Sequence, residues 1–185
     1  MRSLYSTLAA LALIPAATLL GACDDPFGGV DPVLRADSIV LSSANTTAST
    51  RPSAIDIANN VRLTRPERPT EAGLFDLQVR QSGSVFSLVP SPPGGTLRGA
   101  GLQRTTGSTL ENPGEAPREV EGYERDAQPV AVGDRWFVQT RAGAGGCGTT
   151  SKYALLQVVA ADPATGLITL KIISNQSCDD ERLEF

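Results

Sequence analysis

The stretch that decides the fold reads Asp134-Arg-Trp-Phe-Val-Gln-Thr-Arg141, then Tyr153-Ala-Leu-Leu-Gln-Val-Val-Ala160 after a glycine-rich loop, and then Leu167-Ile-Thr-Leu-Lys-Ile-Ile173 after a turn. All three runs are rich in β-branched and aromatic residues, which favour β-strands. The middle run is apolar on both faces except for Gln157, so we expect it to be central and covered on both sides. The connections are too short for parallel crossovers, which predicts a C-terminal three-stranded antiparallel meander. The core of the domain is predicted to include Trp136, Phe137, Leu155, Val158, Leu170 and Ile172.

The sequence before the meander predicts further strands from weaker signals. Residues 38–42 read as a first strand, and residues 74–81 and 84–90 read as a hairpin. Residues 105–129 are rich in Gly, Pro and polar side chains, so we expect irregular structure that either forms a binding surface or has no role. Together these patterns predict an all-β fold, a single antiparallel β-sandwich or partly open barrel of about seven or eight strands.

The chain has three cysteines, at positions 23, 147 and 178. In the predicted meander Cys147 lies in the loop after the first strand and Cys178 follows the third strand, so both reach the same end of the sheet. A disulfide between them is expected if the chain is exported to an oxidising compartment, and two free thiols are the alternative. A bridge over this separation would contribute roughly 3–4 kcal/mol in the loop-entropy model.

The N-terminus carries the pattern of an export signal. A short basic start is followed by an apolar run at residues 4–20 and by Leu20-Gly21-Ala22-Cys23. This order is typical of a secretory signal peptide, and a cysteine directly after two small residues resembles the lipobox of bacterial lipoproteins. The resemblance implies cleavage before Cys23, a lipid on its sulfur and acylation of the new N-terminus. The alternatives are an ordinary signal peptide with a chance cysteine, and an uncleaved transmembrane helix.

These patterns divide the chain into three parts: a lipoprotein signal peptide at residues 1–22, a lipid anchor and flexible tether at 23–37, and a β domain at 38–185. The expected location is the bacterial cell envelope, on a periplasmic or surface-facing membrane leaflet that the sequence leaves open. The expected partner is a membrane, reached through the lipid anchor. The formal net charge of −4 argues against nucleic acid as a charge-driven partner.

The amino-acid composition also limits the catalytic and metal-binding chemistry that the chain can perform. Histidine is absent and the only methionine is Met1, so the chain has no Ser-His-Asp triad, no Cys-His pair and no imidazole metal site. The catalytic groups that remain possible are a carboxylate pair and a Ser-Lys couple, and the sequence shows neither as a motif with meaningful spacing. Asp179-Asp180-Glu181 could offer oxygen ligands to calcium, but we expect a solvated charge run. We therefore expect no enzymatic activity, no catalytic residues, no metal site and no cofactor.

Three stretches resemble the HmuY-like family of bacterial lipoproteins: Phe75-Asp-Leu-Gln-Val79, Arg135-Trp-Phe-Val-Gln-Thr-Arg141 and Ser151-Lys-Tyr-Ala-Leu-Leu-Gln-Val158. The resemblance covers residues 70–175 and implies an all-β fold on the outer face of a membrane. Known members bind haem through axial histidine or methionine, which this chain lacks after residue 1, so no ligand residue carries over. A tyrosinate can ligate haem iron. Tyr123 is then a candidate by elimination, because Tyr153 lies in a predicted strand and is expected in the core.

The leading functional hypothesis is a non-enzymatic cell-envelope lipoprotein, a module that binds another protein, a glycan or a small ligand. The alternative is a haem- or porphyrin-binding lipoprotein that lacks His and Met ligands. A third hypothesis, a hydrolase with a carboxylate pair, requires two acids that converge in one cleft, about 5–9.5 Å apart for a glycosidase.

Overall fold

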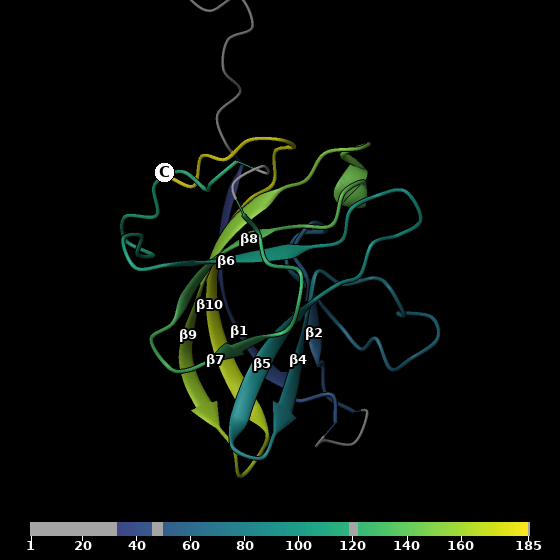
Figure 1. Ribbon diagram of the computed structural model, residues 1–185, viewed down its shortest axis with the longest axis vertical. Helices are drawn as coiled ribbons and strands as arrows, with labels where there is room; N and C mark the ends of the chain where they lie inside the picture. Colours follow the sequence, from purple (N-terminus) through teal and green to yellow (C-terminus); the bar gives the residue numbers. More distant parts are fainter. Residues whose placement is uncertain (1–32, 46–49, 119–121, 185) are drawn as a thin grey trace, which may run out of the picture. The chain divides into compact units, whose positions relative to one another are not determined.

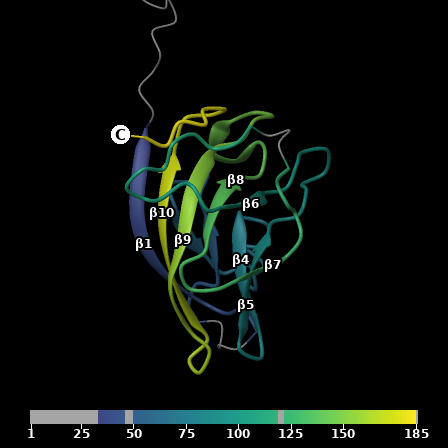
Figure 2. The same cartoon turned by 60° about the vertical axis from the view of Figure 1, so that its left-hand side comes forward.

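Two antiparallel five-stranded sheets form the domain, with strand orders β1-β10-β9-β8-β6 and β3-β2-β4-β5-β7. The computed structural model describes residues 33–45, 50–118 and 122–184; the predicted signal peptide and Cys23 lie outside them. Figure 2 shows β1, β10 and β9 of the first sheet on the left, with β4, β5 and β7 of the second sheet on the right. The first sheet consists of β1 (Leu34–Ser42), β10 (Leu167–Asn175), β9 (Tyr153–Asp162), β8 (Arg135–Gln139) and β6 (Gly101–Thr105). The second consists of β3 (Arg62–Thr64), β2 (Ala54–Asp56), β4 (Leu77–Ser82), β5 (Val85–Pro90) and β7 (Gln128–Val130).

The all-β prediction is confirmed, and of its two alternatives the sandwich is the one observed, because the sheets do not close into a barrel. The strand number is larger than predicted, since the described residues form ten strands. Three of them, β2, β3 and β7, have only three residues each. Segments this short carry no readable alternation, and they become strands through pairing with their neighbours.

The predicted meander is confirmed as β8, β9 and β10, with β9 in the middle of the first sheet. The inner face of this sheet contributes Trp136, Val158, Leu170 and Ile172 to the core between the sheets. Its outer face holds a second apolar cluster, formed by Phe137, Tyr153 and Leu155 together with Ala116, Tyr123 and Leu183. All six predicted core residues are buried. Leu110, Ala116 and Tyr123 therefore cover part of a sheet face, which residues 105–129 were not predicted to do.

The boundary between the tether and the β domain differs from the sequence prediction. The first strand starts at Leu34, so residues 34–37, assigned to the tether, belong to the sheet. They are held in it because β10 offers a pairing partner to each of them, from Leu34 opposite Asn175 to Asp37 opposite Ile172. The hairpin of β4 and β5 is confirmed, with Gly83 in the left-handed conformation at its turn.

Candidate functional site

A pocket of about 470 Å³ opens between the loops at one end of the sandwich. We call it the loop-end pocket. Its walls come from the turn after β2, the segment before β4, the segment after β5 and the segment after β8. Its polar lining includes Asn59, Ser91, Arg98 and Arg141, and its apolar lining includes Leu74, Pro92, Pro93, Leu97, Ala142 and Ala144. This volume falls within the range of small-molecule sites, about 300–1,000 Å³.

Beneath the pocket lies a buried charge cluster around Arg141. The guanidinium donates from Nη2 to Asp56 Oδ1 at 3.0 Å and from Nη1 to Asp76 Oδ1 at 3.1 Å. Both carboxylates have no exposed side-chain surface, whereas 15% of the Arg141 side chain is exposed. Arg62, opposite Asp56 on β3, adds a contact from Nη2 to Asp56 Oδ2 at 3.2 Å. The two acids therefore fix the position of a guanidinium that also lines the pocket.

Asp76 holds three chain segments together. Its Oδ2 accepts the backbone N–H of Ala58 at 2.9 Å, and its Oδ1 accepts the backbone N–H of Arg141 at 2.9 Å. Burial raises the pKa of Asp76 above its ordinary value, while the charge of Arg141 and these two N–H groups oppose the rise. The alternation within residues 74–81 predicts that Asp76 lies on the polar face of a strand. The structure instead buries Asp76 just before β4, where the segments of Asp56 and Arg141 cover it.

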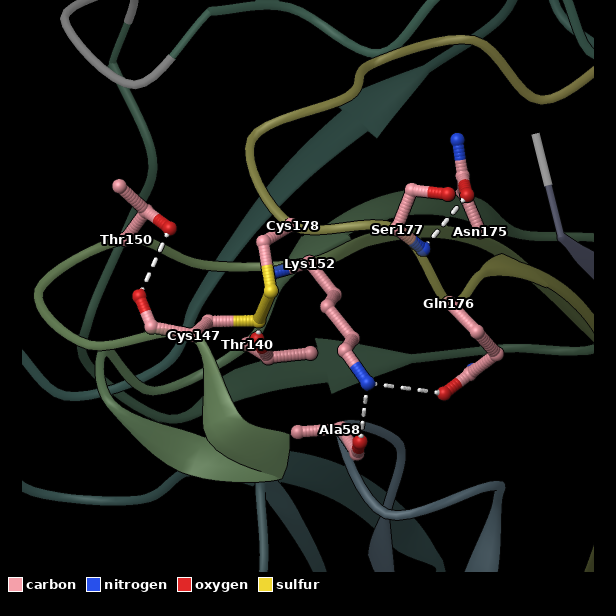
Figure 3. Close-up of a disulfide and its surroundings, with 9 residues drawn as sticks. All are labelled: Ala58, Thr140, Cys147, Thr150, Lys152, Asn175, Gln176, Ser177 and Cys178. Carbon is pink, nitrogen blue, oxygen red and sulfur yellow. Dashed lines mark hydrogen bonds between the residues drawn. A yellow bond between two sulfur atoms is a disulfide. The ribbon is translucent and has the colours of Figure 1, made fainter. Parts of the chain in front are cut away.

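Lys152 extends the cluster toward the disulfide (Figure 3). Its Nζ donates to the carbonyl oxygen of Ala58 at 2.8 Å and to Gln176 Oε1 at 3.3 Å. Burial lowers the pKa of Lys152, and the negative charges of Asp56 and Asp76 oppose that shift. The ammonium therefore joins the turn after β2 to the segment that follows β10.

The predicted pairing of Cys147 and Cys178 is present, with the sulfurs at bonding distance and 5.4 Å between the two Cα atoms. Cys147 follows the short 3₁₀ helix η1 (Ala144–Gly146), which directly follows the pocket-lining residues 141–143. Figure 3 shows the bridge beside Lys152, with Thr150 Oγ1 donating to the Cys147 carbonyl oxygen at 2.9 Å. The bridge thus ties one wall of the loop-end pocket to the end of β10.

Tyr123, the candidate haem ligand, lies in the outer apolar cluster and is buried. Its hydroxyl donates to the carbonyl oxygen of Pro117 at 2.8 Å, and its ring lies 6.4 Å from the ring of Tyr153. Tyr153 is fully buried, as expected of a core residue. Tyr123 does not line the loop-end pocket. The structure therefore gives Tyr123 a structural contact, and its role as a haem ligand stays a prediction.

Comparison finds no matching family model, no matching curated protein and no matching solved structure. Across the described residues, no helix is long and apolar enough to cross a membrane. In the same residues, no group of three His, Cys, Asp or Glu side chains is placed to hold a metal ion. Asp180 of the acidic run pairs with Arg182 at 2.8 Å.

The carboxylate pair of the hydrolase hypothesis has a counterpart in Asp56 and Asp76, which converge on Arg141. Both acids are fully buried and neither lines the loop-end pocket. The sequence analysis did not predict this cluster. Three of its residues, Asp76, Arg141 and Lys152, each lie in a different one of the three stretches that resemble the HmuY-like family. The available signal was a charged residue within or beside each apolar strand.

Proposed function

We propose that this chain is a non-enzymatic lipoprotein of a bacterial cell envelope, anchored through Cys23, whose β domain binds a small ligand in the loop-end pocket. The observation that carries the binding function is the fixed geometry of the pocket. Arg141 is held by two buried carboxylates, and the adjoining loop is tied down by the disulfide. Sites with an apolar lining and a few fixed polar groups are typical of ligand binding, because little ordering is needed when the ligand arrives.

A non-enzymatic role is supported by the way the acids near the pocket are used. Asp56 and Asp76 are buried beneath the pocket and both accept hydrogen bonds from Arg141. General acid or base catalysis needs a group within hydrogen-bond reach of the substrate. These two carboxylates are instead supports for the arginine that a ligand would meet.

Lipid anchoring is tested in a bacterial host that processes lipoproteins. The wild-type chain should incorporate a radiolabelled palmitate and collect in the membrane fraction, whereas Cys23→Ser should lose both properties. Cys178→Ser is the matched control, because it removes a cysteine but leaves the lipobox intact. Equal labelling of wild type and Cys23→Ser, or no label in either, would contradict anchoring through Cys23.

Ligand binding in the pocket is tested by NMR on residues 23–185 carrying Cys23→Ser and purified with the disulfide formed. A fragment library is screened for compounds that shift backbone amide signals. We expect hits to shift Gly73, Gly94 and Gly143, which line three different walls of the pocket. Hits that shift only other surfaces, such as the pocket of about 380 Å³ around Leu110 and Lys171, would contradict the proposed site.

A further inference from the structure

We infer that the outer edge of β1 is an interaction surface, and that its partner is β1 of a second copy of this chain. The two strands pair antiparallel around a twofold axis at Ala36, which joins the first sheets of the two copies into one continuous sheet. The inference concerns a surface outside the loop-end pocket and does not depend on ligand binding there. It follows from the length of the edge, its backbone groups, its charges and the pocket beside it.

The first feature is the length of the edge. Strand β1 has nine residues and pairs only with β10, and Figure 2 shows it at the left of the first sheet. The other edges of the two sheets are shorter or covered, since β3 and β7 have three residues each and β6 pairs at Leu102 with Glu124. Proline, lysine and bulges commonly protect an edge from pairing. Residues 34–42 contain no proline or lysine, and their pairing with β10 has no register shift.

The second feature is the direction of the backbone groups of β1. In an antiparallel pair, alternate residues direct their N–H and C=O groups toward the partner strand. The Val33 carbonyl oxygen accepts the N–H of Gln176, so the odd-numbered residues face β10. The Ser42 N–H donates instead to the carbonyl oxygen of Pro52, outside the first sheet. The even-numbered residues of β1 therefore direct their backbone groups to the outer edge.

These outward groups are available to another strand. Within the described part of the chain, no hydrogen bond reaches the backbone N–H or C=O of Ala36, Ser38 or Val40. All three residues are exposed, and Val40 is 50% exposed. Unpaired strand edges of this kind are templates for the addition of a further strand.

The third feature is the charge pattern, which selects one register. Pairing of the outward groups requires an even-numbered residue opposite an even-numbered residue. With Ala36 opposite Ala36 of the second copy, Arg35 lies opposite Asp37 of the second copy, and the symmetric pair forms as well. A shift that places Asp37 opposite its own copy opposes like charges, and an axis at Ser38 places Asp37 opposite Ile39. Only the register centred on Ala36 joins opposite charges.

Both charged side chains can accept this second contact. Within one copy, Arg35 Nε donates to Asp37 Oδ2, and the two side chains are 44% and 28% exposed. In the described residues, Asp37 Oδ1 and the terminal nitrogens of Arg35 have no other partner. A guanidinium has donors for two carboxylates. Exposed ion pairs add little affinity, so these contacts fix the register more than they hold the two copies together.

The fourth feature is a pocket of about 380 Å³ on the outer face of β1 and β10, whose lining includes Ala36, Ser38 and Leu110. The even-numbered side chains lie on this face, because the odd-numbered Ile39 belongs to the core between the sheets. In the register centred on Ala36, Leu34 of the second copy lies opposite Ser38 and therefore beside this pocket. Burial of apolar surface there stabilises the pairing.

The test measures the register by cross-linking residues 23–185 carrying Cys23→Ser. Ala36→Cys, Ser38→Cys and Val40→Cys each add one thiol at an exposed position. In the proposed pairing the two copies of residue 36 have Cα atoms about 5.5 Å apart, within the range for a disulfide. The copies of residues 38 and 40 are about 14 Å and about 27 Å apart. Under mild oxidation, followed on non-reducing gels, we expect Ala36→Cys to form dimers at least about tenfold faster than the other two variants.

Further substitutions in the Ala36→Cys protein test the backbone and charge contacts. Ser38→Pro removes an outward N–H but no bond to β10, so it should abolish cross-linking, whereas Ser38→Ala should leave the rate unchanged. Asp37→Arg places two arginines face to face and should slow cross-linking about tenfold. Adding Arg35→Asp to Asp37→Arg restores opposite charges and should restore the rate. The amide NMR spectrum of each variant shows whether the fold is retained.

Each outcome decides the inference. Equal cross-linking at positions 36, 38 and 40 would show random collision and overturn the proposed surface. Fastest cross-linking at position 38 would overturn the register and the pairing of Arg35 with Asp37. Absence of cross-links, together with a monomer mass in analytical ultracentrifugation at every concentration, would exclude a second copy as the partner and leave the edge to a strand from another protein.

Discussion

Arg141 binds one carboxylate oxygen of Asp76 twice, through its backbone N–H at 2.9 Å and through Nη1 at 3.1 Å. The two residues are separated by 65 positions, and Asp76 precedes β4 in one sheet while Arg141 follows β8 in the other. The contact therefore joins the two sheets at the loop end. With Asp56 on the second terminal nitrogen, the guanidinium is held at both sides.

Replacement of Arg141 by methionine should lower the free energy of unfolding by about 3–5 kcal/mol at neutral pH, because it leaves two buried carboxylates without their shared cation. Urea unfolding followed by the fluorescence of the buried Trp136 measures the change. Arg80→Gln, at an exposed position of β4, should stay within about 0.5 kcal/mol of wild type. A loss in Arg141→Met no larger than in this control would contradict a role of the cluster in stability.

The stability loss of Arg141→Met should shrink as the pH falls from 7 toward 4. Burial already raises the pKa of Asp76, and Arg141 supplies the largest opposing effect, so its removal raises the folded-state pKa further. A group with a raised folded-state pKa contributes stability that is complete below its unfolded pKa and is lost as pH rises through the folded value. Urea titrations of both proteins at several pH values check this sign. A loss that is constant with pH would show that Asp76 stays ionised in the variant.

Gly145→Ala should be more destabilising than Gly146→Ala by about 1–3 kcal/mol, the usual cost of forcing extra volume into a packed site. Both glycines have positive φ, so both substitutions carry the same kind of backbone strain. Only at Gly145 would the added Cβ meet other groups, at 2.2 Å from the Ala58 carbonyl oxygen and 2.7 Å from Lys152 Nζ, whereas Gly146 faces open space. Thermal unfolding of the pair measures the difference. Equal melting temperatures would contradict the close packing of η1 on the turn after β2.

Cys178→Ser should lower the melting temperature, with a loss of roughly 3–4 kcal/mol in the loop-entropy model. The same loss should appear when the wild-type protein is melted with a reducing agent, and the agent should have no further effect on the variant. Differential scanning calorimetry with and without reductant makes the comparison. Free thiols in protein purified from an oxidising compartment would show that the bridge does not form.

Haemin titration of residues 23–185 carrying Cys23→Ser should produce no saturable shift of the Soret band. The Tyr123 hydroxyl already donates to Pro117, and the ring is buried against Phe137 and Tyr153. A saturable one-to-one shift that is lost in Tyr123→Phe would contradict this expectation and restore the haem-binding hypothesis.

The sequence predicts the meander well because its strands are long and strongly apolar, so local preference and tertiary pairing agree. It fails for β2, a strand of three residues whose form depends on pairing with β3 and β4. The sequence also predicts a tether that extends to residue 37, whereas residues 34–37 belong to β1. Their strand partner is β10, more than a hundred residues away in the sequence.

The candidate site could not be assembled from the sequence for a similar reason. The alternation of polar and apolar residues around Asp76 is that of an exposed polar position. No local pattern indicates its contact with Arg141, 65 positions later in the sequence. The disulfide was predictable because the meander alone brings Cys147 and Cys178 to one end of the sheet. Contacts between sheets depend on how the chain crosses from one to the other, and local patterns carry no information about that path.

The start of β1 has a consequence for how the domain would meet a bilayer. Leu34 pairs with Asn175, and the Val33 carbonyl oxygen accepts the N–H of Gln176 at 2.8 Å, so the chain enters the domain at the loop end (Figure 1). Ten residues lie between Cys23 and Leu34, a span of at most about 40 Å when fully extended. If Cys23 carries a lipid, Leu34 therefore lies no farther than about 40 Å from the bilayer surface, whatever path the intervening residues take.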